Sequence, residues 1–203
     1  MTLTIRPFAY TTSDYRLALD IDAAVFNEPP DSMAEWQHDD QVWDKTYPYY
    51  RDMVMRDGQV IAYVETYQSQ FAYHPQKYTC RIFVDPQHDA PDVRPMVWEH
   101  TQQRLAGENI IAIKSGMLDD KPEAMHFFDE YGFDRIGEEK LSKLDVTRFD
   151  PTNYKTILTQ FHHTNLEIVT LRRLQKTDPE WQQKLYNLDV TVNPDFSQAE
   201  VDQ

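Results

Sequence analysis

Two hydrophobic patterns alternate along the chain and predict its secondary structure. Apolar residues at every second position are typical of β-strands, whereas apolar residues three or four positions apart are typical of amphipathic helices. The first pattern predicts strands at residues 3–8, 51–55, 60–67 and 78–84, a buried strand at 110–113 and two further extended pieces within 133–144. The second pattern predicts helices at residues 15–26, 95–106 and 122–131.

Glycine and proline mark the boundaries of these elements. Asp57-Gly58 suits the tight two-residue turn of a β-hairpin, so the strands on either side of it should pair. Pro95 fits the first turn of a helix, where its missing N–H leaves no bond unmade, and Gly107 and Gly132 end the two later helices. The order of elements predicts an α/β (α+β) fold with a mixed, mostly antiparallel central sheet flanked by helices.

The end of the chain repeats features of its beginning. The Leu-Thr-Ile of residues 3–5 recurs as Leu-Glu-Ile at 166–168, and residues 21–31 recur in outline at 188–195. Short matches also arise by chance, but the shared order of elements favours a true repeat. We therefore predict one domain at residues 1–147, followed at 148–203 by a linker and the first strand and helix of a second, incomplete domain. Such a fragment cannot bury its own apolar face, so we expect it to dock on the first domain or on a second copy in a homodimer.

Charge and composition argue against several classes of partner. The 203 residues carry a net charge of −14, which opposes binding to the phosphate backbone of nucleic acid or to anionic lipid. No stretch approaches the ~20 apolar residues that span a bilayer, and the first residues lack the apolar run of a secretory signal. Cys80 is the only cysteine, so no intrachain disulfide can form. We expect a cytoplasmic protein that binds neither nucleic acid nor membranes.

One run of motifs resembles a known superfamily. The segment at 82–86 (Ile-Phe-Val-Asp-Pro) precedes an irregular loop and a helix, and the segment at 124–133 (Ala-x-x-Phe-Phe-x-x-Tyr-Gly-Phe) follows the next strand. Over about residues 3–146 this arrangement resembles the Gcn5-related N-acetyltransferase (GNAT) superfamily, and the segment from 166 resembles the entry to the second half of its tandem members. The resemblance implies an acyl-CoA N-acyltransferase fold that transfers an acetyl group from acetyl-CoA to a small-molecule or protein amine by direct attack.

The resemblance also implies where acetyl-CoA would bind. In GNAT proteins the pantetheine arm lies between two splayed parallel strands, and the pyrophosphate lies on N–H groups at the start of the following helix, where the helix dipole favours an anion. In this sequence the arm would meet the backbone of Phe83 and Val84. The pyrophosphate would meet the turn and helix start formed by Asp89, Ala90, Asp92, Val93, Arg94, Pro95 and Met96, with Arg94 as a cation.

The sequence departs from the GNAT pattern at two functional positions. Both glycines expected in the phosphate-binding loop are replaced within residues 89–94, and the aspartates there add like charge beside a phosphate. The tyrosine that protonates the departing thiolate in many members matches Phe128, which cannot donate a proton. Tyr131, on the same predicted helix, is a substitute acid, although such a tyrosine is more often a core residue.

Transfer to an amine also requires a base, because the nitrogen must be neutral before it attacks. Glu65 shares a strand face with Tyr63 and Tyr67 and is the candidate base; the alternative is a half-exposed glutamate with aromatic neighbours. Residues 31–50, polar and poorly periodic, predict either a second helix or a loop on the substrate side. No cluster of histidine, cysteine or acidic residues has the spacing of a metal site.

Three functions therefore fit the sequence. The first is an active N-acetyltransferase, and the second is a catalytically degenerate GNAT-like domain that serves as a structural or regulatory module. The third is an unrelated α/β binding protein. The deciding geometry lies between Val84 and Ile113: a donor site requires that the two strands there diverge.

Overall fold

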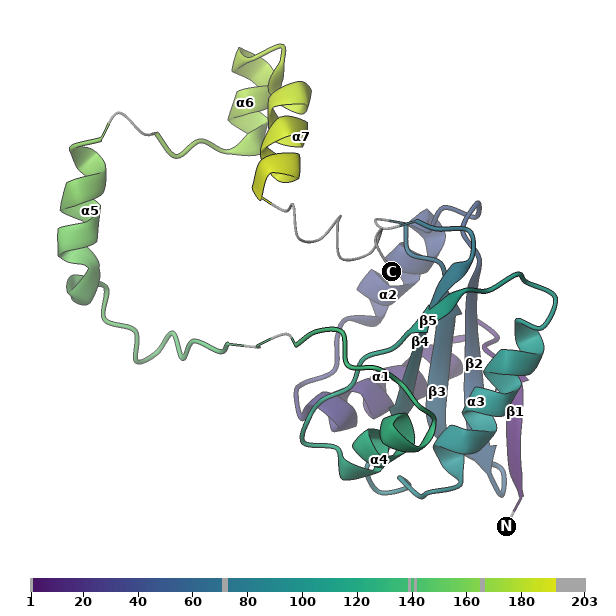
Figure 1. Ribbon diagram of the computed structural model, residues 1–203. Coiled ribbons are helices and arrows are strands. Elements are labelled where there is room, and N and C mark those ends of the chain that lie inside the picture. The colour runs from purple at the N-terminus through teal and green to yellow at the C-terminus, as the bar shows by residue number, and fades with distance from the viewer. Residues whose placement is uncertain (1, 71–72, 139, 141, 165–166, 193–203) are drawn as a thin grey trace. The chain divides into compact units, whose positions relative to one another are not determined.

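The computed structural model describes residues 2–70, 73–138, 140, 142–164 and 167–192. Within this range the chain forms two compact units, divided between Asp134 and Arg135. The first unit contains all of the β-structure that the described residues form, and Figure 1 shows its strands side by side in one sheet.

The sheet of the first unit has five strands. They are β1 (Leu3–Pro7), β2 (Tyr49–Arg56), β3 (Gln59–Tyr67), β4 (Lys77–Val84) and β5 (Ala112–Lys114), and they lie in this order across the sheet. The first four strands pair antiparallel, and β5 pairs parallel to β4. The predicted class, a mixed and mostly antiparallel sheet flanked by helices, is confirmed.

The β2–β3 hairpin follows from its turn residues. Asp57 and Gly58 both have positive φ, 50° and 87°, which is the conformation that a tight hairpin turn requires and that Asp-Gly adopts at low cost. Asp57 Oδ1 also accepts a hydrogen bond of 2.8 Å from Thr2 N, which ties the turn to the start of β1. The predicted hairpin is confirmed.

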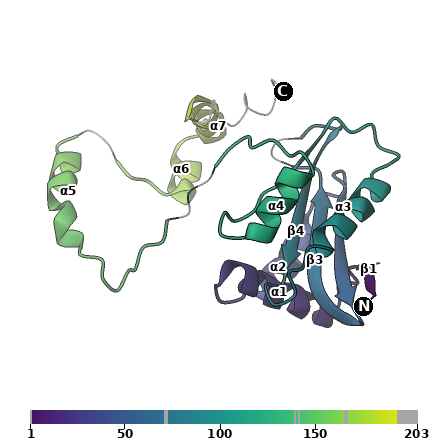
Figure 2. The same cartoon turned by 60° about the horizontal axis from the view of Figure 1, so that its bottom comes forward.

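Helices cover both faces of the sheet, as Figure 2 shows. One face carries α1 (Thr12–Phe26) and α2 (Met33–Val42), and the other carries α3 (Val93–Arg104) with α4 (Pro122–Glu130) against it. α1 begins where the hydroxyl of Thr11 accepts a bond from Asp14 N, and it ends at Asn27, which adopts the left-handed conformation. The predicted helices are confirmed, and residues 31–50 contain the helix alternative.

Two apolar clusters hold these layers together. On the α3 side, Val93 and Val97 pack against sheet residues that include Val64, Cys80 and Val84. On the α1 side, the cluster consists of Phe8, Tyr15, Ala18, Ile21, Met53 and Tyr63, with Trp36 and Phe83 packed against it. The alternation of side chains along each strand therefore supplies both faces of a fully covered sheet.

Two predictions about the later strands are wrong. The strand expected at residues 110–113 is only three residues long, Ala112–Lys114, and it is not buried, since Ala112 and Lys114 are exposed and Ile113 is half-buried. The two extended pieces expected within 133–144 are absent from the described part of that segment, in which Ile136 and Leu144 are each 65% exposed. The apolar residues there follow a strand pattern, but the described residues contain no strand that pairs with this segment.

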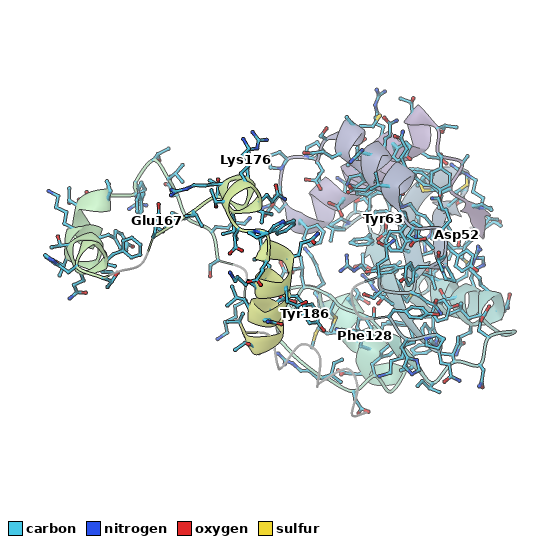
Figure 3. All side chains as sticks on the ribbon, turned by 90° about the horizontal axis from the view of Figure 1, so that it is seen from above. Asp52, Tyr63, Phe128, Glu167, Lys176 and Tyr186 are labelled. Carbon is cyan, nitrogen blue, oxygen red and sulfur yellow. The ribbon has the colours of Figure 1, made fainter. Side chains whose placement is uncertain are left out.

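The second unit is helical where it is described. It contains a short 3₁₀ turn (Pro151–Tyr154) followed by α5 (Lys155–His162), α6 (Leu171–Thr177) and α7 (Trp181–Val192), and Figure 3 labels Glu167, Lys176 and Tyr186 in it. The strand expected at 166–168 lies partly outside the described residues, and residues 167–170 have no regular structure. The helix expected after residues 178–180 is α7. Among all described helices, none is long and apolar enough to cross a membrane.

Candidate functional site

The strands β4 and β5 pair only at one end. Their parallel register joins Lys77 to Ala112, Tyr78 to Ile113 and Thr79 to Lys114, and it stops there. β4 continues for five more residues to Val84, still paired with β3 on its other side. Because β5 ends at Lys114, the second half of β4 has one hydrogen-bonded edge and, among the described strands, one unpaired edge.

The register of the β3–β4 ladder shows which peptide groups face that unpaired edge. Asp85 N donates to Ile61 O at 2.9 Å, directly beyond the Ala62–Val84 pair. Because peptide groups alternate from side to side along a strand, the odd-numbered residues of β4 turn theirs toward β3 and the even-numbered residues turn theirs away. Ile82 and Val84 thus present N–H and C=O groups to the open side.

This geometry changes one expected role. Val84 presents its backbone as expected, but the peptide groups of Phe83 point toward its β3 partner, Tyr63. Ile82, rather than Phe83, is therefore the neighbour of Val84 whose peptide groups face the open side. The sequence contains no direct signal for this choice, because the apolar run 82–84 reads the same in either register.

A side chain marks the point where the strands separate. Ser115, the residue after β5, donates from Oγ to the carbonyl oxygen of Cys80 at 2.6 Å. Cys80 is even-numbered, so this bond independently confirms that its carbonyl faces β5. A continuing parallel ladder would use a peptide N–H at this position; the hydroxyl replaces it and ends the ladder.

The start of α3 is acidic and already carries its own ion pairs. Arg94 is buried, and both of its terminal nitrogens donate to the carboxylate of Asp89, the Nη2–Oδ2 bond being 3.0 Å. Asp92, at the N-cap position, pairs with Arg56 at 2.5 Å and makes no capping bond. Of the first three helical residues, Val93 N already donates to Ala90 O at 3.1 Å and Pro95 has no N–H. Few donors remain there for an anion.

A small hollow adjoins this helix start. It holds about 50 Å³ and is lined by Ala90, Pro91, Arg94, Pro95, Glu123, His126, Phe127 and Glu130, so α3 and α4 both contribute to it. Two of these residues are glutamates, and the one arginine is paired with Asp89. The remaining expected contact, Met96, is half-buried on the next turn and packs against the α3 cluster.

The aromatic residues of α4 pack on one another. Phe128 meets Phe133 edge-on with ring centroids 4.7 Å apart, and Figure 3 labels Phe128 within the first unit. Tyr131 lies at the C-cap of α4, with its ring 4.7 Å from that of Phe127, and it is 41% exposed. The hydroxyl of Tyr131 is the one phenol that the described part of α4 and its caps provide.

Glu65, the candidate base, lies in a buried ionic network on the α1 side of the sheet. Its Oε1 accepts bonds of 2.5 Å from the hydroxyl of Tyr49 and 3.0 Å from Nε of Arg51. Arg51 also donates from Nη1 to Asp40 at 3.0 Å and lies over the rings of Phe8, Trp36 and Tyr49. Burial, together with the charge of Glu65, raises the pKa of Tyr49, so Tyr49 remains protonated. The carboxylate of Glu65 is thus already hydrogen-bonded to an arginine and a phenol.

A larger hollow of about 530 Å³ opens beside this network. It is lined by Tyr10, Tyr15, Gln37, Asp40, Gln41 and Lys45, contributed by α1, α2 and the segments next to them. The hydroxyl of Tyr15 donates to Asp40 Oδ2 at 2.7 Å. Asp40 therefore contacts both the hollow and Arg51. The lining of the hollow is polar and aromatic, with one carboxylate (Asp40) and one ammonium group (Lys45).

Comparison by sequence yields no match: no family model fits the chain, and no curated protein resembles it. Comparison by structure does find similar folds, among them those of several N-acetyltransferases. Their sequence identity to this chain is below 25%, so the likeness concerns the fold.

Three solved structures illustrate the likeness. A protein assigned as a phosphinothricin N-acetyltransferase has a TM-score of 0.58 at 12% identity, over 71% of this chain and 90% of its own. The spermidine/spermine N-acetyltransferase SpeG of Vibrio cholerae has a TM-score of 0.51 at 21% identity, over 70% and 85%. An N-acetyltransferase of Staphylococcus aureus Mu50 has a TM-score of 0.50 at 13% identity, over 68% and 86%. The five-stranded sheet and its flanking helices therefore form a GNAT-type acyl-CoA N-acyltransferase fold.

Proposed function

We propose that the first unit transfers an acetyl group from acetyl-CoA to an amine. The observation that carries this proposal is the unpaired second half of β4, where Ile82 and Val84 present peptide groups to open space beyond the Ser115–Cys80 bond. Strand edges are normally paired or covered, and the second half of β4 has no partner strand on this side among the described residues. An extended ligand that carries its own amide groups, such as pantetheine, supplies the missing partners.

The residues present fit the pantetheine arm better than they fit the pyrophosphate. Ile82 and Val84 would hold the arm by backbone hydrogen bonds, as an added strand is held at a sheet edge. The thioester supplies an activated acyl group. At the start of α3, in contrast, the carboxylates of Asp89 and Asp92 would repel a phosphate. Arg94 could bind a phosphate only if its ion pair with Asp89 broke.

The acceptor follows from the same chemistry. The N-acetyltransferases that resemble this chain in structure include one for phosphinothricin and one for spermidine and spermine, which are amines. The net charge of −14 attracts a cationic acceptor. The nitrogen loses its proton, attacks the thioester carbonyl and displaces the thiolate, with Tyr131 as the candidate acid for the thiolate. No covalent intermediate on the chain is required.

The test is acetyl-CoA binding and turnover with a backbone variant. Val84→Pro removes the N–H that points to the open side but keeps the β3 ladder intact, because Val84 does not donate to β3. We expect acetyl-CoA binding, measured by calorimetry, to weaken about tenfold, which is the loss of one good hydrogen bond. Val84→Ala controls for the lost side chain. No binding of acetyl-CoA to the wild-type chain at millimolar concentration would overturn the proposal.

A second function is favoured by one specific observation. The Asp89–Arg94 pair, with Glu123 and Glu130 beside it, opposes a pyrophosphate, and Phe128 stands where a proton donor is expected. A GNAT-type domain with these features could serve as a structural or regulatory module. Comparing thiol release from acetyl-CoA and from S-acetylpantetheine separates the two functions: release from neither, with any amine, favours the silent module.

The segment 148–203 remains a proposal of its own. We propose that it forms the first elements of a second GNAT-like domain and joins two copies of the chain. Exposed apolar side chains in the described part of this segment, such as Ile157, Leu188 and Val192, support an association that covers them. Sedimentation of the full chain and of a chain ending at residue 147 tests this. The same number of chains per particle in both samples would contradict it.

A further inference from the structure

Asp22 is a carboxylate that the network around Glu65 does not use. It lies on α1, it is half-buried, and its Oδ1 accepts a hydrogen bond of 3.0 Å from the hydroxyl of Tyr63 on β3. Among the described residues this is the only hydrogen bond to the Asp22 carboxylate. Glu65, by comparison, is held by both Arg51 and Tyr49. Asp22 is therefore the more available of the two carboxylates.

Tyr63 connects Asp22 to the strand of the donor site. Its ring stacks on that of Phe83 with centroids 4.5 Å apart and planes 14° apart, and the two residues are partners in the β3–β4 register. Figure 3 labels Tyr63 inside the first unit. Phe83 lies between Ile82 and Val84, whose peptide groups face the open edge. One hydrogen bond and one ring stack thus separate Asp22 from the strand that would hold the thioester.

Further aromatic rings pack against Tyr63 and Phe83. Phe26, one helical turn after Asp22 and on the same face of α1, lies 6.2 Å from Phe83, and Trp36 of α2 meets the ring of Tyr63 edge-on at 6.0 Å. A carboxylate whose hydrogen-bond partner belongs to an aromatic cluster is a favourable place for an ammonium group, because the carboxylate pairs with the cation and nearby rings attract it. The surroundings of Asp22 suit a protonated amine.

The charged groups that face Asp22 are few and come from three sides. Burial raises the pKa of Asp22, and Asp31 and Glu65 raise it further, whereas the hydrogen bond from Tyr63 and the charge of Arg81 on β4 lower it. The net effect is a carboxyl that holds its proton more tightly than an ordinary aspartate. Proton transfer from an ammonium group to a base of this kind costs less free energy than transfer to an ordinary aspartate.

We propose that Asp22 binds the ammonium group of the acceptor and takes its proton before the nitrogen attacks. This inference rests on the proposed function. In the step, an N–H bond of the ammonium breaks and an O–H bond forms on Asp22. The neutral nitrogen then attacks the thioester carbon, the C–S bond breaks, and the thiolate leaves. The amide nitrogen releases its second proton to solvent, the thiolate is protonated, and Asp22 returns its proton to solvent.

The kinetic test compares Asp22→Asn with Asp20→Asn, an exposed aspartate on the same helix. With acetyl-CoA as donor and spermidine or a lysine peptide as acceptor, Asp22→Asn should lower kcat by about 100-fold, the usual loss of a general base. It should also abolish the acidic limb of the pH profile, while acetyl-CoA binding stays unchanged. Asp20→Asn should keep both rate and profile. An Asp22→Asn chain that retains the wild-type pH profile would overturn the inference and leave the proposed function standing.

A second measurement does not depend on turnover. Carbon-13 resonances of the aspartate carboxyls, followed against pH in the full chain, should show one group that titrates above the ordinary value for aspartate and disappears in Asp22→Asn. Added spermidine should shift that resonance. If Asp22 titrates as an ordinary aspartate and spermidine leaves it unmoved, the role of Asp22 is refuted even where transfer is observed. If no transfer occurs at all, the proposed function fails separately.

Discussion

Ser115 donates its hydroxyl hydrogen to the carbonyl oxygen of Cys80 at 2.6 Å, at the position where β4 and β5 stop pairing. The bond closes the paired part of the two strands and leaves the next even-numbered residue, Ile82, with unpaired backbone groups. Ser115 thus stands at the end of the β4–β5 ladder, next to the unpaired half of β4.

Replacing this serine should loosen the junction. Ser115→Ala leaves the Cys80 carbonyl without its partner, and we expect the free energy of unfolding to fall by about 1 kcal/mol. Ser115→Thr keeps the hydroxyl and should lose less. Urea denaturation of both variants measures the difference, with Thr4→Ala, an exposed residue of edge strand β1, as the control. A Ser115→Ala chain as stable as the wild type would show that the bond is not part of the fold's support.

Arg51 should be among the most costly residues to remove. Its side chain is 7% exposed and pairs with Asp40 and Glu65, which are 13% and 12% exposed. Arg51→Met leaves two carboxylates buried without a cation, and breaking such a pair costs about 3 kcal/mol or more. Thermal or urea unfolding measures the loss. Arg16→Met, at an exposed position of α1, should change stability by less than about 0.5 kcal/mol.

Asp14 should make stability depend on pH. Arg6 donates to both of its oxygens, at 2.8 Å and 2.7 Å, and Ala9 N donates at 2.7 Å. These bonds, that of Arg6 first, hold the pKa of Asp14 below its ordinary value of 3.8. Because the folded protein then releases this proton more readily than the unfolded chain, the stabilisation is full above pH 3.8 and is lost as the pH falls through the lower, folded value.

The matching variant is Asp14→Asn. At neutral pH we expect its free energy of unfolding to be about 2 kcal/mol lower than that of the wild type, because the variant loses charged hydrogen bonds at a buried site. The difference between the two proteins should shrink in strongly acidic buffer, where Asp14 is protonated. Urea denaturation at neutral and acidic pH measures it, and a difference that stays constant with pH would contradict the assignment.

Asp89 should weaken the binding of CoA but not of pantetheine. Asp89→Asn removes one negative charge at the start of α3 and can still accept a bond from Arg94. Relief of a repulsion of about 1 kcal/mol corresponds to about fivefold tighter binding of CoA. Binding of pantetheine, which has no phosphate, should stay the same. Calorimetry with both ligands tests this, and equal effects on the two would show that Asp89 does not face the pyrophosphate.

Short-range signals in the sequence determined most of the elements. Asp57-Gly58 specified the hairpin because its turn requires positive φ at two adjacent residues, and Gly132, with φ of 70°, marked the end of the α4 region. The period-two alternation of 60–67 and 78–84 predicted strands that occur as β3 and β4. Each of these signals acts within a few residues, so it can be read without the rest of the chain.

Tertiary structure decided the features on which the proposed function depends. The Tyr63–Asp22 bond joins residues 41 positions apart, and the Ser115–Cys80 bond joins residues 35 apart. The choice of Ile82 over Phe83 for the open edge came from the Asp85–Ile61 bond, which fixes the register of the ladder. The local pattern of apolar residues is the same for either register, and it does not identify a partner that is distant in the sequence. Only the pairing of strands, chosen by the burial of both sheet faces at once, could assign these roles.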